Sequence, residues 1–314
     1  MMRRLFYLVV LAALAGLAVF WIVTTPRPID AAALPAGYKA DAKNGELMFA
    51  AGGCASCHAV PDEGKCDNPH YTDHQRLAGG RCLKTPFGVF NVPNISSDKA
   101  DGIGGWTDLQ FVNAVTKGVT PAGEHYYPAF PFASYTRMTV PDVLDLKAYL
   151  ATLPAVAGKA KPHELPLPLQ WRRMLGGWKF LNFDNKTFAA GAKQSPEWNR
   201  GAYLVQGPGH CGECHTPRDP LGGPWTAWRL AGGPAPEGKG WVPNLTQAKD
   251  GLAEWSKQDI ASYLGTGLTP SGDSVGGAMV AVQTNMALLP VADRLAIAEY
   301  IKSLAAIENP RPKK

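Results

Sequence analysis

The sequence predicts two similar domains with helical segments that follow one N-terminal apolar helix. Three observations lead to this prediction. The pattern Cys-x-x-Cys-His occurs twice, at residues 54–58 and 211–215. The segments that follow the two copies match each other at an offset of about 150 residues, which indicates a duplicated domain rather than a short-period repeat. Residues 5–23 contain no charged side chain.

The N-terminal residues 1–24 predict a membrane anchor or an export signal. Arg3 and Arg4 precede the apolar run, and a positive flank of this kind stays in the cytoplasm while the rest is exported. The run is close to the roughly 20 residues that a spanning helix needs, and longer than the roughly 7–15 of a signal core. Small residues at 31–33 offer a cleavage site, so both interpretations stay open. Residues 25–40 form a tether.

The first domain is expected at residues 41–153. A helix over 44–52 leads into the first motif, and a second helix over 106–117 begins after Thr107 as N-cap and ends at Gly118. A proline-rich and aromatic loop follows. The segment 141–153 carries apolar residues at helical spacing and predicts the closing helix.

The second domain is expected at residues 195–308, because the same order recurs there. Val-Pro-Asn at 242–244 corresponds to Val-Pro-Asn at 92–94, and Gly267 corresponds to Gly118. Between the domains, residues 154–194 form a proline-rich connector. Its basic and aromatic segment 170–183 predicts a short helix that docks on a domain; contact with a partner or with the membrane surface is the alternative. Residues 309–314 are a tail.

The repeated motif is the attachment signature of haem c. Two thiols one helical turn apart reach the two vinyl groups of one porphyrin, and the histidine after the second cysteine ligates the iron. The motif residues are Cys54, Cys57 and His58 in the first copy and Cys211, Cys214 and His215 in the second. A thioredoxin-like pair would require a βαβ setting that neither copy has. A zinc site would bring two Cys-x-x-Cys pairs closer in sequence.

A second axial ligand decides between electron transfer and small-molecule chemistry, because methionine keeps the iron six-coordinate and raises its potential. Seven methionines are present. Position and scarcity favour Met138 in the first domain. In the second domain both Met279 and Met286 are candidates on the residues alone.

Two further pairs of residues are expected near the haems. The carbonyl of Pro93 or Pro243 would accept the N–H of the proximal imidazole and orient it. The indole N–H of Trp106 or Trp255 would donate to a propionate. Turn formation and core packing explain the same residues, so both interpretations stand.

The two remaining cysteines, Cys66 and Cys82, follow the first motif and predict a disulfide, because an exported chain meets an oxidising compartment. The net charge of +5 is mild, and no long basic run is present. Nucleic acid is therefore not an expected partner.

Taken together, these stretches resemble the multihaem c-type cytochrome subunits of membrane-associated bacterial alcohol, aldehyde and gluconate dehydrogenases. The matching residues are 54–58, 92–95, 102–106, 126–131, 135–139, 200–205, 209–218 and 277–279. The resemblance implies an all-α fold of two tandem class I cytochrome c domains, with one haem c each. It implies Met138 and Met279 as distal ligands. Many relatives carry three haems, whereas this chain has two motifs, and the Cys66/Cys82 insertion is not general.

The function expected from the sequence is electron relay by a membrane-anchored dihaem cytochrome whose haem domains lie in the periplasm, on the bacterial inner membrane. The donor would be a dehydrogenase, and the acceptor a quinone, a cytochrome or a terminal oxidase. The alternative is a haem enzyme, a dihaem peroxidase or a sulfur-compound dehydrogenase, with one open or unusual axial site. No carboxylate pair, catalytic triad or phosphate loop suggests other chemistry.

Overall fold

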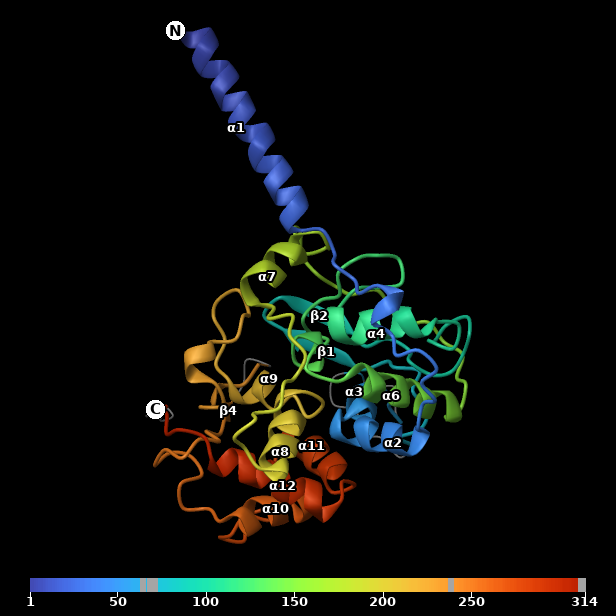
Figure 1. The fold of residues 1–314 in the computed structure, drawn as a ribbon, viewed down its shortest axis with the longest axis vertical. Coiled ribbons are helices and arrows are strands. Elements are labelled where there is room, and N and C mark those ends of the chain that lie inside the picture. Colours follow the sequence, from blue (N-terminus) through green and yellow to red (C-terminus); the bar gives the residue numbers. More distant parts are fainter. Residues whose placement is uncertain (63–65, 67–72, 237–239, 310–314) are drawn as a thin grey trace.

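A computed structural model describes residues 1–62, 66, 73–236 and 240–309. Figure 1 shows one long helix, α1 (Met2–Val23), that projects away from a body of short helices. The body has two parts, which we name the first lobe (residues 41–153) and the second lobe (residues 195–308). The predicted tail lies outside the described residues except for Asn309.

The first lobe is built on one helix crossing. Helix α2 (Ala42–Ala51) packs across α6 (Val140–Thr152). The crossing is close because Gly45 has no side chain: a Cβ there would lie 1.9 Å from the carbonyl oxygen of Asp145. The remaining helices of this lobe are α3 (Cys54–His58), α4 (Asp108–Lys117) and α5 (Phe132–Tyr135).

The second lobe repeats the crossing. Helix α8 (Pro196–Gln206) packs across α12 (Val291–Lys302), and a Cβ on Gly201 would lie 1.8 Å from the carbonyl oxygen of Ala296. The other helices are α9 (Gly212–His215), α10 (Lys257–Thr266) and α11 (Met279–Met286). Each lobe therefore has the order of elements that the sequence repeat predicts.

The ends of α4 and α10 follow from their capping residues. Thr107 accepts from the backbone N–H of Gln110, whose side chain accepts from Thr107 N–H in return, which is a capping box. Gly118 ends α4 with φ of +57°. Ser256 and Gly267 cap α10 in the same way, with φ of +77° at the glycine.

The structure is mostly helical, and it adds two short antiparallel strand pairs to the expected all-α fold. Strand β1 (Cys82–Thr85) pairs with β2 (Gly88–Asn91), and β3 (Gly233–Pro234) pairs with β4 (Trp241–Val242). These strands have two to four residues, too few to show a period-two pattern in the sequence. Two 3₁₀ turns, Ala31–Ala33 and Thr226–Trp228, complete the elements of the described chain.

The connector contains α7 (Met174–Asn182), which lies at the base of α1 in Figure 1. The helix contacts α1 directly. The predicted helix was expected over 170–183, so its position along the chain was right. Its contact with the N-terminal helix was not foreseen.

The two lobes share packed surfaces. Ala50 and Ala51, at the end of α2, belong to the hydrophobic core of the second lobe together with Met286. In return, Tyr203 of α8 packs in the core of the first lobe and donates its hydroxyl hydrogen to Asp142. The lobes are therefore in close apolar contact next to the first motif.

Candidate haem sites

The first motif forms a short helix of its own. Gly52 ends α2, Gly53 turns the chain with φ of +56°, and α3 then runs from Cys54 to His58. The Nδ1 of His58 lies 2.8 Å from the carbonyl oxygen of Pro93, which can only accept, so Nδ1 carries the proton. Nε2 is left with its lone pair. Burial lowers the pKa of His58 to about 4, which keeps the imidazole in the neutral form that binds a metal.

The second motif has the same geometry. Cys211 precedes α9, and the Nδ1 of His215 donates to the carbonyl of Pro243 at 2.8 Å. Burial lowers the pKa of His215 as well. In both lobes, then, a proline carbonyl orients a neutral histidine, which is a usual arrangement behind a metal-binding imidazole.

A repeated Leu-Ala-Gly-Gly segment, missed in the sequence, builds both histidine sites. The backbone N–H of Gly79 donates to the carbonyl of His58 at 2.8 Å, and that of Gly232 donates to the carbonyl of His215 at 2.8 Å. Both glycines have positive φ, of +72° and +73°. A Cβ on Gly79 would lie 2.6 Å from Pro93 O, and one on Gly232 would lie 2.7 Å from Pro243 C. The signal was in the sequence, at residues 77–80 and 230–233.

The motif thiols do not have the properties of a redox pair. Burial raises the pKa of Cys54 to about 12 and that of Cys211 to about 12. A thioredoxin-like pair needs a lowered pKa, so that one thiol reacts as thiolate. The four motif cysteines are in no disulfide; Cys66 is joined to Cys82 instead.

The candidate distal residues differ in their surroundings. Met138 is 2% exposed and lies in the core of the first lobe between α5 and α6. Met279 begins α11, after Gly276 and Gly277, and is partly buried against the core of the second lobe. Met286 ends α11, is 4% exposed, and belongs to the cluster that contains Ala50 and Ala51 of the first lobe.

The two tryptophans take matching places. Trp106 precedes α4 and packs against the first core, and Trp255 precedes α10 and packs against the second. The carbonyl of Trp106 accepts from Nζ of Lys147 at 2.8 Å. The ring of Trp255 lies edge-on to Tyr263, with centroids 5.5 Å apart.

Each motif is contacted by a side chain of the opposite lobe. Asn285 of the second lobe donates to Ser56 Oγ at 2.7 Å, inside the first motif. Ser134 of the first lobe donates to Glu213 Oε1 at 2.6 Å, inside the second motif. The Nε2 of His210, next to Cys211, donates to the carbonyl of Gly52 at 3.2 Å.

An aromatic side chain fills the space between these contacts. The Tyr135 hydroxyl donates to the same Gly52 carbonyl at 3.2 Å, and its ring meets the His210 ring edge-on, with centroids 5.6 Å apart. Both attachment segments therefore lie at the surface that the lobes share. The repeat in the sequence does not predict this shared surface, because it carries no information about how the two copies pack against each other.

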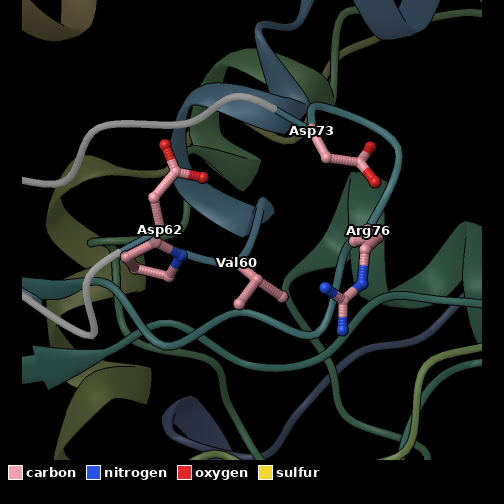
Figure 2. Close-up of a pocket in the computed structure, with 5 residues that line it drawn as sticks. Val60, Asp62, Asp73 and Arg76 are labelled. Carbon is pink, nitrogen blue, oxygen red and sulfur yellow. The ribbon is translucent and has the colours of Figure 1, made fainter.

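A separate hollow of about 380 Å³ lies beside the first motif and is lined by Val60, Pro61, Asp62, Asp73 and Arg76. Figure 2 shows Asp73 and Arg76 on one side of it and Asp62 on the other. Its charged lining offers neither a histidine nor a methionine, so it does not resemble a haem site.

The donor sets fit haem c. Each lobe presents two thiols within or directly before one short helix, and a neutral histidine whose Nδ1 is already bonded. A methionine lies in or against each lobe's core. Within the described ranges, no group of three His, Cys, Asp or Glu side chains is placed to hold a metal ion directly. Both sites thus offer the side chains that a covalently attached porphyrin would use.

Comparison with known proteins agrees with this chemistry. The cytochrome c family profile matches residues 42–154. The chain is 47% identical to a "Diheme cytochrome c-type" protein of Cereibacter sphaeroides over 95% of this chain and 97% of the relative.

Two larger relatives are subunits of dehydrogenases. The chain is 36% identical to the fructose dehydrogenase cytochrome subunit of Gluconobacter japonicus, over 93% of this chain and 57% of that subunit. It is 35% identical to the gluconate 2-dehydrogenase cytochrome c subunit of Pantoea cypripedii, over 84% of this chain and 59% of that subunit. The chain thus spans less than two thirds of these subunits. It belongs to the dihaem c-type cytochromes and carries two haem c groups.

Proposed function

We propose that the protein is a membrane-anchored electron relay made of two class I cytochrome c domains. Cys54 and Cys57 hold one haem and Cys211 and Cys214 the other. His58 with Met138, and His215 with Met279, are the axial ligands. Haem c bound in this way accepts and gives up one electron at the iron.

The observation that carries the proposal is the juxtaposition of the two attachment segments. Each motif is contacted by a side chain of the opposite lobe, Ser56 by Asn285 and Glu213 by Ser134. Electron tunnelling falls steeply with the separation of the two groups. Attachment points on a shared surface favour transfer from one group to the other within the molecule.

Met279 is preferred to Met286 because of where the two side chains lie. Met286 is buried in the core of its own lobe, in a cluster that also takes in Ala50 and Ala51 of the first lobe, and its neighbour Asn285 reaches Ser56 across the lobe contact. Its role is explained by packing. Met279 follows two glycines at the start of α11 and is partly buried against the core of its own lobe.

Helix α1 is proposed as a retained anchor rather than a removed signal. Among the described residues it is the one helix long and apolar enough to cross a membrane, and its apolar window is 0% buried in the body. Its last turn, however, is part of the folded body. Thr24 is 1% exposed, its carbonyl accepts from Nε2 of His125 at 2.9 Å, and its hydroxyl accepts from Nε of Arg173 at 2.9 Å. Cleavage at residues 31–33 would remove these contacts.

The proposed donor is a dehydrogenase, because several relatives are named as cytochrome subunits of fructose, gluconate and alcohol dehydrogenases. The proposed acceptor is a quinone, a cytochrome or a terminal oxidase. Arg3 and Arg4, in the first turn of α1, support the proposal that the haem lobes lie on the periplasmic side of the inner membrane.

Ligand binding to the purified holoprotein tests the relay against the haem-enzyme alternative. Two haems with histidine and methionine on opposite faces have no free position, so carbon monoxide should leave the spectrum of the reduced protein unchanged at neutral pH. Cyanide should likewise bind the oxidised protein only slowly. Rapid, stoichiometric binding of either ligand to one native haem would favour an enzyme and overturn the proposed ligation.

A further inference from the structure

Helix α7 turns its apolar side chains toward solvent. Phe180 is 71% exposed and Leu181 is 68% exposed, and Met174 is exposed as well. Met174, Gly177 and Leu181 fall on one stripe at helical spacing, with Phe180 beside it. On the opposite side, Leu175 and Gly176 are buried against the body. A helix on a globular surface normally has the reverse arrangement.

The charged side chains near α7 point into the body instead. The Nζ of Lys179 donates to the carbonyls of Lys117 and Gly118, both at 2.7 Å, and burial lowers its pKa to about 7. Arg172 donates to the carbonyl of His125 at 2.8 Å. The segment 165–183 contains no acidic residue. The exposed face of α7 is therefore uncharged.

Helix α7 lies directly against the end of α1. The backbone of Gly176 touches that of Thr24: a Cβ on Gly176 would lie 2.5 Å from Thr24 Cα. Arg173 donates to the carbonyl of Trp21 at 2.5 Å and stacks on the Trp21 ring, with its guanidinium carbon 3.9 Å from the centroid. Trp171 is 51% exposed and meets the ring of Phe20, with centroids 5.7 Å apart.

The length of α1 determines where its contact with α7 lies relative to the bilayer. A helix of 22 residues is about 33 Å long at 1.5 Å per residue, close to the thickness of the hydrocarbon core of a bilayer at about 30 Å. If α1 spans the bilayer, its C-terminal turn emerges at the headgroup layer, and α7 emerges with it. Tryptophan and an uncharged apolar helix face are what that layer accepts.

We propose that the outward face of α7, formed by Met174, Gly177, Phe180 and Leu181 together with Trp171, is a second membrane contact that rests in the interfacial layer of the bilayer. The proposal rests on the proposed role of α1 as a spanning anchor. Its consequence is that the haem lobes are held in one orientation to the membrane rather than swinging on a tether. Since Arg172, Arg173 and Lys179 are bonded within the protein, the contact made by α7 should not depend on anionic lipid.

Single-cysteine labelling of the full-length holoprotein tests this contact. The motif cysteines are bonded to haem, and Cys66 and Cys82 are joined to each other, so an introduced cysteine is the one reactive thiol. Leu181→Cys reports on α7, and Leu288→Cys is the matched control, because Leu288 is a leucine of the second lobe with 67% exposure. Leu14→Cys, in the middle of α1, reports on insertion. Each variant is placed in nanodiscs of zwitterionic lipid, one copy per disc, and reacted with a charged maleimide.

The expected result is that Leu181→Cys reacts at least about fivefold more slowly than Leu288→Cys, at low and at high salt. If the two labelling rates differ by less than this, the α7 face does not contact the membrane. A face that binds a protein partner instead would give that result, because the disc contains no partner. Leu14→Cys separates the two proposals. If Leu14→Cys is protected while Leu181→Cys reacts freely, the anchor stands and the α7 contact fails. If Leu14→Cys reacts freely or residue 14 is cleaved off, the anchor itself fails and the α7 contact fails with it.

Discussion

At the scale of single residues, the chemistry depends on how each histidine is held. Pro93 and Pro243 each accept a hydrogen bond from the histidine of their own lobe. Gly79 and Gly232 lack a side chain, so their backbone can lie against the backbone of these prolines. The Val-Pro-Asn repeat was enough to expect the carbonyl contact. The Leu-Ala-Gly-Gly repeat is equally visible in the sequence, but its meaning depends on positive φ angles and backbone contacts that only the fold provides.

The methionine assignment predicts a difference between two neighbouring variants. Met279→Ala removes the proposed sulfur ligand of the second haem, so it should lower the potential of one haem and change its absorption spectrum. Met286→Ala removes a buried packing side chain instead. It should cost about 2–5 kcal/mol in the free energy of unfolding and leave both haem spectra native. A redox titration and a denaturation curve of each variant measure both effects. The reverse pattern would make Met286 the ligand.

The disulfide predicts a loss of stability without a loss of haem. In the chain-entropy model, the Cys66–Cys82 link closes a loop of 16 residues and contributes about 3 kcal/mol by restricting the unfolded chain. Cys66→Ser/Cys82→Ser should lower the free energy of unfolding by that order, with two haems per chain still attached. Thiol labelling of the unreduced, denatured wild type should find no reactive cysteine. Two labels per chain would contradict the pairing.

At the scale of elements, the helices that begin and end with strong capping residues were predictable. Thr107 and Gly118 bound α4 because a capping box and a left-handed glycine are local devices. The strands β1–β4 were missed because pairs of two to four residues depend on distant partners. The contact of α7 with α1 was missed for the same reason, since residues about 150 positions apart meet only in the fold.

A glycine at a helix crossing and a glycine on an open helix face should respond in opposite ways to substitution by alanine. Gly201→Ala places a methyl group against the carbonyl oxygen of Ala296, 1.8 Å away, so α8 and α12 must separate. We expect a loss of about 3 kcal/mol in the free energy of unfolding. Gly177→Ala meets nothing within 4 Å and should stabilise the protein by about 0.5–1 kcal/mol. Denaturant titration of both variants measures the two changes in the free energy of unfolding. If Gly201→Ala is no less stable than Gly177→Ala, the α8–α12 crossing tolerates a side chain.

At the scale of the whole molecule, the repeat predicted two lobes but not how they meet. The contacts of Ser56 with Asn285 and of Glu213 with Ser134 place each motif against the opposite lobe. Residues of α2 enter the core of the second lobe. A duplicated sequence constrains each copy alone, so the docking, and with it the case for a coupled pair of haems, depends on the structure.

Proton NMR of the reduced and half-reduced holoprotein tests the coupled pair most directly. The methyl group of an iron-bound methionine lies over the porphyrin ring, whose ring current moves its signal far upfield. We expect two such signals in the reduced protein, one from each lobe. At half reduction, exchange between the two haems should proceed at a rate that does not change with protein concentration. A single upfield signal, or exchange that occurs only through collisions between molecules, would contradict the account.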